Sequence, residues 1–154
     1  MASVTKSIDV RVPVRTAYDQ WTQFEEFPRF MEGVKSVKQL DDTHLHWIAE
    51  IGGQTKEWDA EITEQVPDER IAWRSTSGAK NAGVVTFHRL GDGLTRVTLQ
   101  MEYEPEGAAE SIGDALGFVS RRVEGDLERF RDFIEGRGVE TGAWRGEVRQ
   151  DPTR

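Results

Sequence analysis

The fold is decided by a stretch near the C-terminal end, residues 108–136, which reads AAESIGDALGFVSRRVEGDLERFRDFIEG. Its apolar residues recur in steps of three and four, the spacing of one face of an α-helix: Ile112, Leu116, Val119, Val123, Leu127, Phe130 and Ile134. The charged residues between 121 and 132 are interpreted as a solvated face, with opposite charges three or four apart. At about 1.5 Å per residue the helix is roughly 40 Å long, so it needs a large apolar partner.

Three glycines interrupt this helix. Gly113, Gly117 and Gly125 each cost about 1 kcal/mol relative to alanine in a helix interior. Gly113 and Gly117 lie on one face, so two interpretations stay open. The stretch is a core helix that tolerates its glycines, or its N-terminal third kinks or lets another group approach the backbone.

The chain before the helix supplies the partner, because most of it alternates with a period of two. Residues 4–12 predict a first strand with Ile8, Val10 and Val12 on its inner face. Residues 14–21 and 24–31 then carry two short apolar stripes, the second broken by Pro28, which predict two short helices joined by a bend.

Six further strands follow from residue 34 onward, linked mostly by short turns. Turn signals stand at residues 52–53, 67–68 and 91–93, and residues 76–82 are expected to form a polar loop. Acidic and basic residues on the outer faces of neighbouring strands are expected to pair across the sheet.

This order predicts an α+β fold in which a bent antiparallel sheet wraps around one long helix and leaves a cavity between them. The chain of 154 residues is expected to form one domain over residues 1–138, followed by a polar tail over residues 139–154. Trp144 either pins this tail to the body or is exposed, and removal of the tail is expected to leave the fold intact.

The composition of the chain excludes several classes of function. The net charge of −8 disfavours nucleic acid and anionic lipid as partners, and the absence of cysteine excludes disulfides and thiolate chemistry. With neither a signal-peptide pattern nor an apolar run long enough to span a membrane, the protein is expected to be cytoplasmic. The five tryptophans and seven phenylalanines suggest an aromatic interior.

Motifs for catalysis or metal binding are weak. His44 and His46 form an H-x-H pair, but their strand phase places them on the outer face and no third ligand has suitable spacing, so no metal site is expected. Glu57, Asp59 and Glu61 alternate with core residues and are expected to be solvated. Neither a phosphate-binding loop nor a nucleophile elbow is present, and no cofactor or catalytic residue is assigned.

What remains is an apolar inner surface that faces the long helix. The predicted cavity-lining residues are Trp47, Trp58, Trp73, Ser75, Val85, Phe87, Leu99, Met101 and Tyr103 from the strands, with Leu116, Val119 and Val123 from the helix. Ser75 and Tyr103 are its polar members. The Tyr103 hydroxyl either has a partner in the core or orients the polar end of a ligand.

Several segments resemble a known superfamily. They are VPVRTAYDQW at residues 12–21, FEEFPRFM at residues 24–31, WDAEITEQVPDERIAWRS at residues 58–75 and the G-x-V-x-F pattern at residues 83–87. Together with the long helix they are similar to the START-like (SRPBCC, Bet v1-like) superfamily, in its polyketide cyclase/dehydrase-like branch. The resemblance implies a helix-grip fold: a seven-stranded curved antiparallel sheet, two short helices after the first strand, and a C-terminal helix over a hydrophobic cavity.

Three functions stay open, of which the resemblance implies the first two. The first is binding of a hydrophobic small molecule, such as a polyketide, quinone or lipid, in the cavity. The second is polyketide cyclisation and dehydration, in which relatives often use an Arg and a Tyr; Tyr103 suits this, whereas Arg74 has the phase of an outer residue. The third is a protein-interaction module, and a homodimer is possible. A cyclase needs at least two ionisable or hydroxyl groups converging in the cavity, whereas a binder does not.

Overall fold

The computed structural model describes residues 2–51, 53–103 and 112–149; within these ranges, the side chains of residues 2, 51 and 112–118 are not described. The elements follow in the order β1 (Ala2–Val10), α1 (Val14–Trp21), the 3₁₀ helix η1 (Phe24–Arg29), β2 (Val34–Gln39), β3 (His44–Ile51), β4 (Gln54–Val66), β5 (Arg70–Gly78), β6 (Asn81–Gly91), β7 (Leu94–Tyr103) and α2 (Ile112–Arg137). This confirms the predicted order of strand, two short helices, six strands and long helix.

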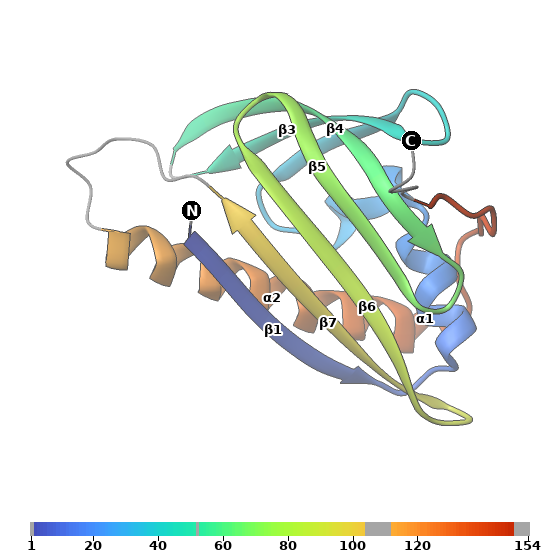
Figure 1. Cartoon of the computed structure of the whole chain (residues 1–154). Coiled ribbons are helices and arrows are strands. Elements are labelled where there is room, and N and C mark those ends of the chain that lie inside the picture. The colour runs from blue at the N-terminus through green and yellow to red at the C-terminus, as the bar shows by residue number, and fades with distance from the viewer. Residues whose placement is uncertain (1, 52, 104–111, 150–154) are drawn as a thin grey trace.

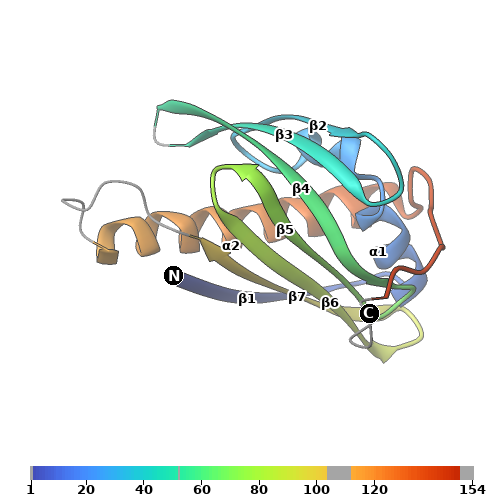
Figure 2. The ribbon, with the colours of Figure 1, turned by 45° about the horizontal axis from the view of Figure 1, so that its top comes forward.

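The strands form a seven-stranded antiparallel sheet in the order β1-β7-β6-β5-β4-β3-β2. The sheet curves strongly, and α2 runs along its concave side (Figures 1 and 2). Such curvature lets a single helix cover the apolar face of a whole sheet. The expected α+β helix-grip fold is confirmed.

The predicted polar loop over residues 76–82 is wrong. Strand β5 continues to Gly78 and β6 begins at Asn81, so only residues 79 and 80 separate them. Gly78 has a φ of 79°, which suits the tight turn. The segment looks like a loop in sequence because the side chains of Thr76 and Ser77 are exposed, and an exposed strand end carries no apolar alternation.

The predicted apolar face of α2 packs into the core. Val123, Leu127, Phe130 and Ile134 are at most 5 % exposed. The helix is unbroken from Ile112 onward, across all three glycines, while residues 108–111 of the predicted helix lie outside the described residues.

At one end, the space between sheet and helix is filled by aromatic side chains. We call this the closed end; it holds Trp21, Phe24, Phe27, Phe30, Phe87 and Phe130. Trp21 packs edge-on against Phe130 with 4.8 Å between ring centres, and Phe30 packs against Phe130 at 5.3 Å. Residues of α1 and η1 therefore complete the core where the sheet alone does not reach the helix.

The convex face of the sheet is solvated and carries the cross-strand charge pairs that the sequence predicts. Arg74 pairs with Glu61 at 3.2 Å, and Arg70 pairs with Glu64 at 2.6 Å. Exposed pairs of this kind contribute less than about 1 kcal/mol each. None of the helices within the described residues is long and apolar enough to cross a membrane.

Residues 138–149 follow α2 and lie against α1 at the closed end (Figure 1). Trp144 is half-buried, and its backbone N–H donates to Thr22 Oγ1 at 3.1 Å. Of the two interpretations of Trp144, the structure favours attachment to the body.

Candidate functional site

The structure places the predicted cavity residues of the strands on the concave face, as the alternation requires. Trp47, Val85, Phe87, Leu99 and Val123 are buried. Trp58, Trp73, Met101, Tyr103 and Val119 face the same core but are only partly buried. The side chain of Leu116 lies outside the described residues.

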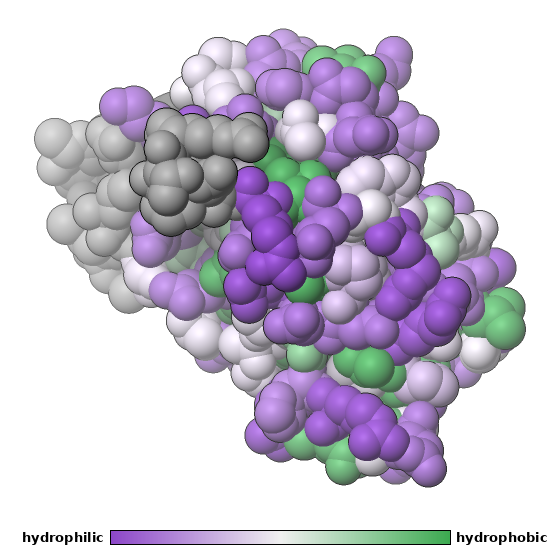
Figure 3. All heavy atoms as spheres, turned by 45° about the vertical axis from the view of Figure 1, so that its right-hand side comes forward, coloured by the Kyte–Doolittle hydropathy of each residue, from purple (hydrophilic) through white to green (hydrophobic). Residues whose placement is uncertain are grey.

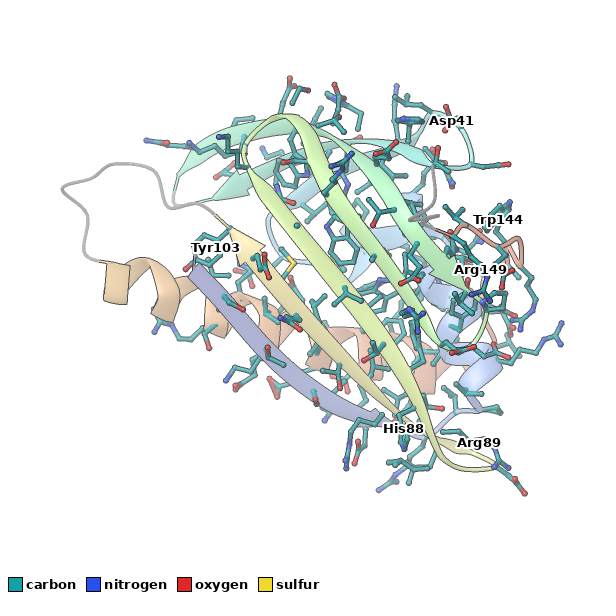
Figure 4. The ribbon with its side chains drawn as sticks, viewed as in Figure 1. Asp41, His88, Arg89, Tyr103, Trp144 and Arg149 are labelled. Carbon is teal, nitrogen blue, oxygen red and sulfur yellow. The ribbon has the colours of Figure 1, made fainter. Side chains whose placement is uncertain are left out.

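The partly buried residues share one end of the sheet, which we call the open end. There Tyr103 pairs in register with Asn81, Met101 with Gly83, and Trp58 with Gly78. Figure 4 shows Tyr103 at this end of β7, far from Trp144 at the closed end. The inward aromatic surface is therefore incompletely covered near the N-terminal third of α2.

A glycine fixes one wall of the open end. The indole of Trp73 lies close to Gly83 on the neighbouring strand. A Cβ at residue 83 would come within 2.5 Å of the indole ring. Glycine permits this close approach, and a larger residue would push Trp73 toward the helix.

Two stacked tryptophans form the adjoining wall. Trp47 on β3 and Trp58 on β4 are opposite each other in register, with ring centres 5.6 Å apart and planes 11° from parallel. Both indole Nε1 atoms are buried and have no hydrogen-bond partner among the described residues. A buried donor without a partner costs about 1–3 kcal/mol.

The Tyr103 hydroxyl is a third group of this kind. It is buried without a hydrogen-bond partner among the described residues, and burial raises the pKa of the phenol above its ordinary value. Tyr103 thus remains protonated at neutral pH and able to donate. The Ser75 hydroxyl differs, because it accepts the backbone N–H of Asn81 at 3.1 Å and so stabilises the β5–β6 turn.

A pocket of about 530 Å³ opens beside this surface, at the edge formed by β2, β3 and α2. Its lining consists of Glu32, Gly33, Val34, Lys35, Glu50, Gly53 and Arg122. These residues were not among those predicted to line the cavity, although Val34 pairs directly with Ala49, two residues from Trp47. Four of these seven residues are charged, and Lys35 and Glu50 pair at 3.0 Å.

A hydrogen-bond cluster on α2 holds the rim of this pocket. Arg122 donates to the carbonyl of Glu32 at 2.6 Å, and Asp126 accepts the N–H of the same residue at 3.0 Å. Arg129 donates to the carbonyl of Phe30 at 2.9 Å and to Asp126. Gly33 has a φ of 85°, and a side chain there would collide with the Arg122 guanidinium.

This cluster corrects the interpretation of the charged face of α2. Asp126 was assigned to a solvated face, but its side chain is only 13 % exposed. Burial raises the pKa of the Asp126 carboxyl to about 6, although the bonds from Arg129 and from the Glu32 backbone act against the rise. The charge spacing alone does not separate such a cluster from exposed ion pairs.

The two strand histidines lie on the convex face, as predicted. His44 pairs with Asp41 at 2.9 Å, and His46 pairs with Asp59 at 2.6 Å. Asp59 also accepts the Ser77 hydroxyl, and these bonds lower the pKa of its carboxyl. No group of three or more His, Cys, Asp or Glu residues suited to a metal occurs within the described parts of the chain.

Comparison with known proteins identifies the family. Residues 10–131 match the model of the family described as polyketide cyclase / dehydrase and lipid transport. The chain belongs to this family. A relative from the same comparison, a 17.2 kDa protein encoded in the melC2-rnhH intergenic region of Streptomyces lincolnensis, is 59% identical over 149 residues, which cover 96% of this chain and 99% of the relative.

Solved structures share the fold of this chain. A START superfamily protein from Mycobacterium smegmatis superposes with a TM-score of 0.70 at 19% identity, covering 88% of this chain and 95% of the other. The Zhui aromatase/cyclase from Streptomyces sp. R1128 gives 0.75 at 14% identity, covering 93% and 99%. At such identities these two structures establish the fold alone.

The polyketide cyclase / dehydrase and lipid transport model ends before the C-terminal segment. It covers the open end but not residues 138–149. Sequence reasoning did not predict the polar contacts of this segment or of the α2 cluster, for one reason. Both are built from polar residues whose partners lie about 90–126 positions away in sequence.

Proposed function

We propose that this protein binds an apolar small molecule that carries hydrogen-bond acceptors, such as carbonyl oxygens, at the open end between the sheet and α2. The surrounding surface is aromatic and aliphatic, which suits a ligand of low polarity. The family to which the chain belongs includes polyketide and lipid ligands in its description, which supports the same class.

The proposal rests on the unpartnered hydrogen-bond donors of the concave face. The Nε1 atoms of Trp47 and Trp58 and the hydroxyl of Tyr103 are buried without partners among the described residues. An indole N–H donates and does not accept. A ligand with carbonyl acceptors, such as a quinone or a polyketide, satisfies these donors, whereas a saturated hydrocarbon does not.

Catalysis of cyclisation is the weaker alternative. It needs an acid and a base close together, and among the described residues the strands place their imidazole and carboxyl side chains, such as those of His46, Asp59 and Glu61, on the convex face. Ser75 and Tyr103 supply hydroxyls, but Ser75 already accepts a backbone N–H. The similarity to the aromatase/cyclase therefore supports a shared fold more than a shared reaction.

A pair of matched probes tests the proposal by calorimetric titration. 2-Methyl-1,4-naphthoquinone has two carbonyl acceptors, and 2-methylnaphthalene has the same ring skeleton without them. We expect the quinone to bind at least about tenfold more tightly, since each hydrogen bond contributes about 1 kcal/mol.

Two variants locate the donors in the same experiment. Tyr103→Phe and Trp47→Phe each remove one donor, and each is expected to reduce the preference for the quinone about threefold to tenfold. Trp144→Phe removes an indole N–H at the closed end and serves as the control that leaves the preference unchanged. Equal binding of both probes, or no binding of either, would contradict the proposal.

A further inference from the structure

A second structured site lies at the closed end and does not depend on the proposed function. There, residues 141–148, which we call the strap, are held on α1 by side chains that bond to the strap's backbone. Thr141 donates its N–H to Gln20 Oε1 at 2.8 Å, and Gln20 Nε2 donates to Thr141 Oγ1 at 3.0 Å. Thr22 accepts the N–H of Trp144. Gln20 and Thr22 are at most 2 % exposed, so the strap covers them fully.

The far end of the strap adds to the edge of β4. Val148 and Gln65 exchange two backbone hydrogen bonds, of 2.7 and 2.8 Å, in an antiparallel bridge. Between the two attachment points, Gly142 lies beside the side chain of Gln23. Side-chain contacts to the backbone and strand addition together form a groove fitted to one extended peptide.

The groove contains a pocket for a guanidinium group. Arg145 donates to the Asp19 carboxylate and to Asp68 Oδ2, the latter at 2.9 Å. Its guanidinium carbon lies 5.6 Å from the centre of the Tyr18 ring, within the range of a cation–π contact. Asp19 is 1 % exposed, and burial raises the pKa of its carboxyl, against which the bond from Arg145 acts.

The pocket adjoins further buried polar groups. Asp68 Oδ1 is buried without a hydrogen-bond partner among the described residues. The Tyr18 hydroxyl interacts with the side chain of Gln65. Gln65 is 1 % exposed and Tyr18 is completely buried, so these groups belong to the interior of the site. Figure 3 shows the side of the molecule that faces right in Figure 1, where hydrophilic residues predominate, as suits a site for a polar peptide.

We propose that the groove formed by Asp19, Gln20, Thr22, Gln65 and Asp68 is a recognition site for an extended, arginine-bearing peptide. The strap fills it in cis, and the strap of a second copy of this chain fills it in trans. The groove is built by α1 with its C-cap residue Thr22, by β4 and by the β4–β5 turn, so its contacts are the same whichever chain carries the peptide. The connection through residues 138–140 sets the effective concentration of the cis strap.

The test uses the full-length chain with Arg145→Ala, which weakens the cis strap and leaves the pocket intact. A fluorescent peptide with the sequence of residues 139–149 is titrated and followed by anisotropy. We expect saturable binding, weakened at least about tenfold when the peptide itself carries Arg145→Ala. The wild-type chain is expected to bind the peptide at least about tenfold more weakly than the variant, because its groove is already filled.

Arg149→Ala is the matched control, since Arg149 is exposed and pairs with its near neighbour Glu147 at 2.8 Å. Figure 4 shows Arg149 and Trp144 on the same side of the molecule. This control is expected to behave as the wild type. If Arg145→Ala does not fold, Arg145→Lys keeps the charge but loses the two-pronged contact and takes its place. A folded variant that ignores the peptide, or that binds it equally with and without its arginine, overturns the proposal.

Discussion

At the scale of single residues, the unbonded hydroxyl of Tyr103 distinguishes a ligand-binding surface from an ordinary core. A core tyrosine usually donates its hydroxyl to a nearby carbonyl, but Tyr103 is buried without such a partner among the described residues. Trp47 and Trp58 share this property on the adjacent strands. The donors are already buried in this structure, so their desolvation is complete before any ligand forms a bond with them.

This difference predicts the effect of Tyr103→Phe on stability. Because the hydroxyl is not bonded, its removal is expected to leave the free energy of unfolding unchanged or to raise it by up to about 1 kcal/mol. Urea denaturation monitored by circular dichroism measures the change. A loss of more than about 1 kcal/mol would show that the hydroxyl is bonded within the protein.

Asp126 predicts a pH dependence. Burial raises the pKa of its carboxyl from 3.8 to about 6, so the folded protein holds this proton more tightly than the unfolded chain does. Its contribution to stability is therefore complete below pH 4 and is lost as the pH rises to 6, by on the order of 3 kcal/mol.

Comparison with Asp126→Asn isolates this contribution, because the variant lacks the ionisation while the other carboxyls stay the same. The free energy of unfolding of the wild type, minus that of the variant, is expected to fall between pH 4 and pH 7. Asp132→Asn changes a carboxyl that is 70 % exposed and is the control substitution on the same helix. A difference that does not vary with pH would contradict the raised pKa.

At the scale of elements, the strap changes the expectation for the C-terminal segment. The sequence suggested a tail that is dispensable for folding, since Trp144 and Val148 are nearly its only apolar residues. In the structure, Arg145 neutralises the buried Asp19, and Thr141 and Trp144 bond to buried side chains of α1. We now expect removal of residues 139–154 to destabilise the fold.

Arg145→Ala tests the contribution of the strap to stability without changing the chain length. It leaves the buried Asp19 carboxyl with the long 3.7 Å contact to Arg15 and the carboxyl of Glu140 beside it, which is expected to cost about 3 kcal/mol. Arg149→Ala is expected to cost less than about 0.5 kcal/mol, as for other surface substitutions. Thermal unfolding of both variants measures the difference, and equal melting temperatures would show that the strap is dispensable.

Elements with a regular apolar period could be predicted from the sequence. The spacing from Val119 to Ile134 gave α2, and the alternation in each strand gave the inward positions of Trp47, Trp73 and Met101. The β5–β6 turn and the α2 cluster could not be predicted, because exposed strand ends and buried polar contacts leave no apolar period. The polar contacts of the strap with α1 could not be predicted for the same reason.

At the scale of the whole molecule, the closed end and the open end have different roles. The closed end is packed with aromatic rings and sealed by the strap, so it supplies rigidity. The open end leaves five inward apolar side chains partly exposed and three donors unpartnered among the described residues. A rigid scaffold that presents a preformed apolar surface at one end is the arrangement expected of a small-molecule binder.

Native mass spectrometry of the wild-type protein purified from its own host tests this central claim most directly. We predict a species heavier than the chain by the mass of one small molecule, which on extraction proves to be an apolar compound with carbonyl groups. A protein that is detected only at the mass of the chain, and that stays so after incubation with excess 2-methyl-1,4-naphthoquinone, would contradict the claim that the open end is a ligand-binding site.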